Sequence, residues 1–86
     1  MDPEATVELM LAAADSAGLM ASRYEYGDMI VFWVEDGVKF LDTIADWEAP
    51  EESDKPALQA IQSMPLQWVP FIDPNDGSLR IYIDQE

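Results

Sequence analysis

The chain has 86 residues, of which 49% are apolar, and a net charge of −14 from 18 acidic and 4 basic residues. This length predicts a single domain over residues 1–86, and the apolar content excludes a disordered tail. Cysteine and histidine are both absent, which excludes disulfides, thiolate nucleophiles, imidazole metal ligands and a Ser-His-Asp relay.

The first predicted element is a helix that begins at Asp2 and ends near Gly18. Asp2 is a favourable N-cap, Pro3 suits the first turn, and Gly18 suits the C-terminal cap. Its apolar side comprises Val7, Met10, Leu11, Ala14 and Ala17. Next to the apolar side of the helix lies a row of acidic residues, which comprises Glu4, Glu8 and Asp15. This row is either a solvated face or part of a binding surface.

Residues 19–42 predict three consecutive antiparallel strands. A strand over residues 19–26 is followed by Gly27 and Asp28, which favour a turn. Met29–Val34 is apolar on both faces, which predicts a central strand with Trp33 in the core. The Asp-Gly pair at residues 36–37 predicts a hairpin, so residues 38–41 are expected to return as a third strand, which either ends there or continues through Ile44.

Residues 42–54 predict an irregular acidic connector, interrupted by Pro50. Its acids are Asp42, Asp46, Glu48, Glu51, Glu52 and Asp54, and Trp47 lies among them. An aromatic side chain surrounded by charge is typical of a binding hot spot. The alternative, that Trp47 covers the edge of a small core, is the commoner role of such a residue. The spacing of these acids selects no particular ion, so we expect neither a metal site nor a cofactor.

The remaining residues predict a short helix over 56–64, capped by Ser53 or Asp54 and stopped by Pro65, and then two strands. The first covers residues 66–72 and is an edge or bulged strand because it contains Pro70. Residues 73–77 resemble a calcium loop only partly, since Gly77 comes one position early, and they predict a turn. Residues 79–83 alternate as a half-buried strand. The predicted class is α+β, in the order α-β-β-β-α-β-β, with a mostly antiparallel sheet and two helices.

The charge restricts the expected partners and location. It repels nucleic acid and anionic lipid, so the predicted partner is a basic protein surface, such as that of a nucleic-acid-binding protein or nuclease complex. Mimicry of DNA requires the acids to gather on one face. Spread evenly, the acids give one charge per ~280 Å² of surface, against ~110 Å² for the duplex.

The longest apolar run is Met29–Val34, far short of the ~20 residues of a membrane span, and the acidic start is unlike a signal peptide. We therefore expect a cytoplasmic protein, in the host cytoplasm if a phage encodes it.

The predicted function is inhibition by binding, without catalysis, as in anti-CRISPR or anti-restriction proteins of phages and in nuclease immunity proteins. The expected partner-binding residues are Asp42, Asp46, Trp47, Glu48, Glu51, Glu52 and Asp54, with Glu4, Glu8 and Asp15. The alternative is a cytoplasmic chaperone or adaptor that forms a homodimer through an apolar face. An enzyme would need a pocket with convergent carboxylates. Solubility alone, or adaptation to high salt, would also account for an acidic excess.

Overall fold

A computed structural model describes residues 3–85, except for the side chains of Pro65 and Gln67. The elements are α1 (Pro3–Ser16), β1 (Ala21–Tyr26), β2 (Met29–Val34), α2 (Gly37–Asp46), η1 (Glu52–Asp54), α3 (Lys55–Gln62), α4 (Pro65–Trp68), η2 (Val69–Phe71) and β3 (Leu79–Asp84). The predicted α+β class is confirmed. The predicted order is not, because two of the five expected strands are helical.

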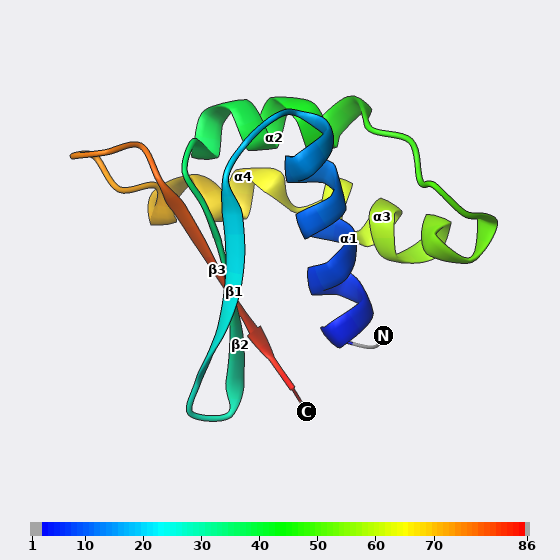
Figure 1. Cartoon of the computed structure of the whole chain (residues 1–86), viewed down its shortest axis with the longest axis horizontal. Helices are drawn as coiled ribbons and strands as arrows, with labels where there is room; N and C mark the ends of the chain where they lie inside the picture. Colours follow the sequence, from blue (N-terminus) through cyan, green and yellow to red (C-terminus); the bar gives the residue numbers. More distant parts are fainter. Residues whose placement is uncertain (1–2, 86) are drawn as a thin grey trace.

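The three strands form one antiparallel sheet in the order β1-β2-β3, so β2 is central, as predicted. Figure 1 shows α1 beside the sheet and α2 across the end of the sheet opposite the β1–β2 turn. That turn has only two residues, and Gly27 adopts a left-handed φ of +61° within it. The pairing of Tyr26 with Met29 on either side of the turn fixes the register of the hairpin.

The core lies between α1 and the sheet, and α2 and α3 both pack against α1 and contribute buried side chains to it. Its buried side chains are Val7, Leu9, Met10, Ala13, Ala14, Ile30, Phe32, Val34, Phe40, Ile44, Leu58, Ile61, Leu79 and Ile81. The rings of Phe32 and Phe40 pack with centroids 5.0 Å apart, which joins β2 to α2. The alternate positions Ile30, Phe32 and Val34 face this core, as the two-residue period of a strand requires.

α1 ends at Ser16, and the predicted glycine cap, Gly18, follows it with a left-handed φ of +72°. The N–H of Leu19 donates to the carbonyl of Ala14 at 2.9 Å, and the N–H of Gly18 donates to that of Asp15 at 3.0 Å. This pair of hydrogen bonds is a Schellman cap, which satisfies the last carbonyls of the helix. The predicted N-cap, Asp2, lies outside the described residues.

The predicted hairpin at residues 36–37 and the third strand over 38–41 are wrong, because α2 begins there. Asp36 caps the helix, since its Oδ1 accepts the N–H of Lys39 at 3.1 Å. The N–H of Gly37 donates to the carbonyl of Gly77 at 2.8 Å, so the start of α2 is held by the turn before β3. An Asp-Gly pair serves a helix start as readily as a hairpin, and here the contact with a distant segment decides between them.

The predicted strand over residues 66–72 is also wrong, because this segment forms α4 and η2. Each of the two begins with a proline in its first turn, a position where the missing N–H has no cost. The helix predicted over 56–64 and the final strand are confirmed as α3 and β3. The turn at residues 73–77 is confirmed as well: Oδ1 of Asp73 accepts the N–H of Asn75, and Oδ1 of Asp76 accepts that of Ser78, both at 2.8 Å.

Trp33 is half-buried and not in the core, contrary to prediction, whereas its neighbours Val31 and Phe32 are fully buried. Trp33 lies on the face of β2 that points away from α1. The six-residue apolar run therefore has one face in the core and one on a less covered side of the sheet.

Candidate protein-binding surface

The acidic row of α1 is partly neutralised by Arg23 of β1. Its guanidinium forms two hydrogen bonds with the carboxylate of Glu4, one of them from Nη2 to Oε1 at 3.1 Å, and Nη1 lies 3.9 Å from Oε1 of Glu8. The hydrogen bonding from Arg23 holds the pKa of Glu4 below its usual value and raises the pKa of Arg23. Asp15 is exposed near the other end of the helix. The three acids therefore do not form one uniformly negative row.

The acids expected on a connector are divided among three elements, and we call them together the acidic segment. Asp42 and Asp46 lie on the exposed side of α2, Glu48 and Glu51 lie in the loop that follows it, and Glu52 and Asp54 lie in η1. The expectation of a connector beginning at residue 42 is thus wrong, since regular helix continues to Asp46. Four of the six acids nevertheless lie beyond the end of α2.

Little positive charge faces the acidic segment. Lys55 Nζ lies 2.7 Å from Oε2 of Glu52, in an exposed pair. Within residues 3–85, Asp42, Asp46, Glu48 and Glu51 form no salt bridge. These four carboxylates are all exposed, so the segment remains strongly negative.

Trp47 is half-buried and packs against the core. Gln62 of α3 holds the main chain beside it, because Nε2 donates to the carbonyls of Ile44 at 2.9 Å and Trp47 at 3.0 Å. This side chain satisfies carbonyl groups at the C-terminus of α2, a role that the sequence analysis missed. No local signal identifies it, since Gln62 and Trp47 belong to separate elements.

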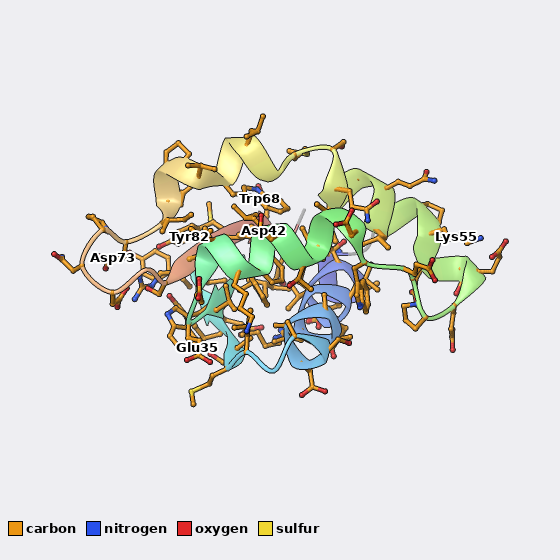
Figure 2. The ribbon with its side chains drawn as sticks, turned by 90° about the horizontal axis from the view of Figure 1, so that it is seen from above. Glu35, Asp42, Lys55, Trp68, Asp73 and Tyr82 are labelled. Carbon is orange, nitrogen blue, oxygen red and sulfur yellow. The ribbon has the colours of Figure 1, made fainter. Side chains whose placement is uncertain are left out.

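Acids also lie away from the acidic segment. Figure 2 shows the exposed Glu35 and the half-buried Asp73 at places separate from each other and from Asp42 of the segment. The concentration of charge that DNA mimicry requires is therefore present only locally.

The face of the sheet that points away from α1, here called the open face, carries most of the exposed aromatic side chains. By strand register its three rows are Ser22–Trp33–Arg80, Tyr24–Val31–Tyr82 and Tyr26–Met29–Asp84. Val31 is fully buried in the centre, whereas Tyr26 and Tyr82 are 69% and 49% exposed. The alternation of Tyr24 and Tyr26 is visible in the sequence, but their union with Tyr82 depends on the pairing of β3.

The open face is hollowed at the end beside the β1–β2 turn. A cavity of about 600 Å³ there is lined by Tyr26, Gly27, Asp28, Met29, Tyr82 and Asp84. A second apolar groove, of about 330 Å³, runs between α2 and α4 and is lined by Val38, Leu41, Asp42, Ala45, Leu66 and Val69. The molecule thus offers two largely apolar concave sites, each with at least one carboxylate.

Neither a metal centre nor a transmembrane helix is present within the part of the chain that the structure describes. Nowhere in residues 3–85 do three or more acidic side chains converge as ligands of a cation would. None of the described helices combines the length and the apolar character that crossing a bilayer requires. Comparison with protein-family models, with curated protein sequences and with solved structures finds no match to this chain.

Proposed function

We propose that this chain is a small acidic protein that binds a basic surface of another protein and blocks it. Where that surface binds nucleic acid, the bound chain would exclude the nucleic acid. The observation that carries the proposal is the acidic segment, where Asp42, Asp46, Glu48 and Glu51 are exposed and form no salt bridge with any described cation. Charge of this kind steers a cationic partner toward the protein before contact.

The proposed mechanism is occlusion without chemistry. The negative segment would attract the cationic groove of the target, and the body of the domain would then exclude the groove's own ligand. Association should be fast at low salt and should slow as salt screens the charges, because the Debye length falls to about 10 Å at 0.1 M.

The test begins with the immobilised chain, which is exposed to host-cell lysate and eluted with a NaCl gradient. The retained protein is then purified, and its association and dissociation rates are measured against the wild type and two triple variants. One variant removes acids of the segment (Asp46→Asn, Glu48→Gln, Glu51→Gln). The matched control removes three acids elsewhere (Glu8→Gln, Asp15→Asn, Glu25→Gln).

We expect the segment variant to associate at least ~10-fold more slowly and with a weaker salt dependence, and the control variant to change less. If only the control variant fails, the surface lies on α1 and β1. If neither variant changes binding, or if the retained protein is acidic, electrostatic blocking is the wrong mechanism. Trp47 is less suitable for this test, because its removal would also disturb the core that it covers.

A second candidate function is that of a chaperone or adaptor that forms a homodimer. The groove between α2 and α4 favours it, since Val38, Leu66 and Val69 beside it are exposed. Self-association has to overcome the repulsion between two chains of charge −14, so it should strengthen with salt. Light scattering of Leu66→Ser and wild-type chains in about 0.5 M NaCl tests this candidate. A wild-type monomer at millimolar concentration would exclude it.

A further inference from the structure

β1 forms an edge of the sheet that no other strand of the described chain extends. The strand order is β1-β2-β3, so β1 has a neighbouring strand on one side only. Figure 1 looks onto the other side of β1, which lies in front of β2, and no helix crosses in front of it. The opposite edge of the sheet differs, because Leu79 of β3 forms a bridge there with Ile72. β1 is therefore the edge that offers a further strand a place to pair.

The main-chain groups of β1 alternate between its two sides. The N–H of Glu35 donates to the carbonyl of Met20 at 2.9 Å, and these two residues continue the register of the β1–β2 ladder. Hydrogen-bonded pairs recur at every second residue of an antiparallel ladder, so the even-numbered residues of β1 bond to β2. The odd-numbered residues direct their N–H and carbonyl groups away from β2, and they are Ala21, Arg23 and Glu25. Within residues 3–85 these outward groups form no main-chain hydrogen bond.

The charges of β1 restrict how a second copy of the strand can pair with this edge. In a two-fold antiparallel pair, the odd-numbered residues have to lie opposite one another. Two such registers pair five residues of the strand from each copy. The register centred on Arg23 sets this arginine opposite its own copy, whereas the register centred on Tyr24 sets each Arg23 opposite a Glu25. Like charges placed opposite each other destabilise a sheet and opposite charges stabilise it, so the register centred on Tyr24 is favoured.

Arg23 can meet Glu25 of a second copy without leaving Glu4. A guanidinium has five N–H donors, and the Glu4 carboxylate accepts one hydrogen bond from Nη1 and one from Nη2. Glu25 is exposed and forms no salt bridge within the described chain. The Cα atoms of a hydrogen-bonded antiparallel pair are about 5.5 Å apart, a separation that two long side chains easily bridge. Charges on an edge strand commonly prevent pairing, but this pair of opposite charges is symmetric about Tyr24 and permits one register.

The same arrangement separates the most negative parts of the two chains. α2 lies at the end of the sheet opposite the β1–β2 turn (Figure 1), so antiparallel pairing of β1 places the two α2 helices at opposite ends of the joined sheet. The exposed carboxylates of Asp42 and Asp46 are carried apart with them. α1 reaches Arg23 through Glu4, near its first residue, and ends shortly before β1 begins. Each α1 therefore extends away from a two-fold axis at Tyr24, and the two helices diverge.

We propose that two copies of this chain pair through β1, in the antiparallel register centred on Tyr24, and form one continuous six-stranded sheet. Only five residues of each strand meet in this interface, so the dimer should form at high concentration and not at low. The inference does not rest on the proposed function. It adds to it, because a dimer carries two acidic segments and would bind a target with two basic sites more tightly than one chain does.

The test is sedimentation equilibrium of the full chain, from micromolar to millimolar concentration, in about 0.15 M NaCl, where the Debye length is about 8 Å. Glu25→Arg sets an arginine opposite Arg23 in both cross-strand pairs, so it should weaken dimerisation at least about tenfold. The matched control is Asp15→Arg, which makes the same change of charge at an exposed residue near the far end of α1. It should dimerise at least as strongly as the wild type, since it lowers the repulsion between chains. Overall repulsion alone would strengthen dimerisation in both variants.

A mixture of two variants tests the register directly. Arg23→Glu sets glutamates opposite each other and should also be monomeric, as Glu25→Arg is. An equimolar mixture of these two variants should form heterodimers, because each cross-strand pair then joins an arginine to a glutamate. The two variants together carry the same charge as two wild-type chains, so a gain on mixing cannot come from overall charge. A ¹⁵N spectrum of each variant checks its fold, and if Arg23→Glu is unfolded, Glu25→Arg and Asp15→Arg decide the question.

A mixed sample of ¹³C-labelled and unlabelled wild type locates the contact. We expect an intermolecular NOE between the Hα atoms of Tyr24 in the two copies, which face each other as a non-hydrogen-bonded pair. Leu66→Ser, in the groove between α2 and α4, should dimerise as the wild type does.

Three results would overturn the inference. They are a wild-type chain that stays monomeric at millimolar concentration, a Glu25→Arg variant that dimerises as Asp15→Arg does, and intermolecular NOEs that join the groove between α2 and α4. The last result would support the second candidate function instead. These measurements use the chain alone, so their failure leaves the binding of a basic partner untouched, and a failed search for that partner leaves the dimer untouched.

Discussion

Gly37 at the start of α2 lies against Leu79 of β3 so closely that a Cβ on Gly37 would be 2.8 Å from the Leu79 Cβ. The same added carbon would lie 3.0 Å from Cγ1 of Ile72. The absence of a side chain at residue 37 is thus what allows α2 to begin against the last strand.

Gly37→Ala should therefore destabilise the protein, although alanine is the better helix former. The gain in helix propensity is at most about 1 kcal/mol, whereas overpacking costs about 1–3 kcal/mol. Urea denaturation measures the difference, and Val38→Ala, at the exposed neighbour, serves as the control with an expected change within ~0.5 kcal/mol. A stabilised Gly37→Ala protein would show that α2 can move away from β3 without cost.

Phe32 and Trp33 are adjacent in β2 but should differ in their contribution to stability. Phe32→Ala removes a fully buried ring that packs on Phe40, and should cost about 3–5 kcal/mol. Trp33→Ala removes a half-buried ring from the open face, and should cost about 1–2 kcal/mol. Urea denaturation of both variants checks the order, and equal losses would place Trp33 in the core.

Gln62→Ala should destabilise the protein by about 1–2 kcal/mol, because it leaves the carbonyls of Ile44 and Trp47 without their side-chain donor. Gln59→Ala is the matched control, since Gln59 is an exposed glutamine of the same helix. Thermal unfolding followed by tryptophan fluorescence reports both variants, because Trp47 lies at the site. Equal melting temperatures for the two variants would contradict the role assigned to Gln62.

The ion pair between Arg23 and Glu4 should contribute to stability in a pH-dependent way. Hydrogen bonding to Arg23 holds the folded-state pKa of Glu4 below its usual 4.5, so the carboxylate is favoured in the folded protein. Its contribution is complete above the unfolded-state pKa and is lost as the pH falls through the lower folded-state value. The stability difference between wild type and Arg23→Gln should thus shrink between about pH 5 and pH 3.

The comparison uses urea denaturation at each pH together with an NMR titration of the Glu4 carboxyl carbon. Lys39→Gln is the control, since it removes the same charge from a residue with no salt bridge in the described structure. A Glu4 pKa that does not rise in Arg23→Gln would refute the assignment.

The melting temperature should rise as NaCl increases from about 0.01 M to about 0.1 M, since the Debye length falls from about 30 Å to about 10 Å. The repulsion among the acids that form no salt bridge is then screened. The Asp46→Asn/Glu48→Gln/Glu51→Gln variant should show a smaller rise than wild type in differential scanning calorimetry. An unchanged melting temperature in wild type would mean that the acids are too dispersed to matter.

Sequence patterns predicted those elements that local chemistry decides. The apolar run of β2, the Gly-Asp turn before it and the glycine cap of α1 all specify their conformation within a few residues. The start of α2 was mispredicted because Asp36 and Gly37 suit two structures, and the contact with Leu79 chooses one. Residues 66–72 were mispredicted because a short apolar run has no period that distinguishes a strand from successive helical turns.

The candidate sites also divide into those that neighbouring residues define and those that only tertiary contacts create. The acids of the acidic segment could be identified because they are neighbours in the sequence. The neutralisation of Glu4 by Arg23 could not, because it needs β1 to lie beside α1. The cavity could not be identified either, since it exists only when β3 pairs with β2 and brings Tyr82 to Tyr26 and Met29.

Because β2 is the central strand, its two edges are paired at different times during synthesis of the chain. β1 and β2 can pair within microseconds of emerging from the ribosome, because a two-residue turn joins them. β3 follows only after α2, α3 and α4, a delay of seconds at roughly 5–20 residues per second of translation. Throughout that interval the edge of β2 that later pairs with β3 presents unpaired N–H and C=O groups. The nascent chain is therefore most prone to aggregation after β2 has been synthesised and before β3 has been.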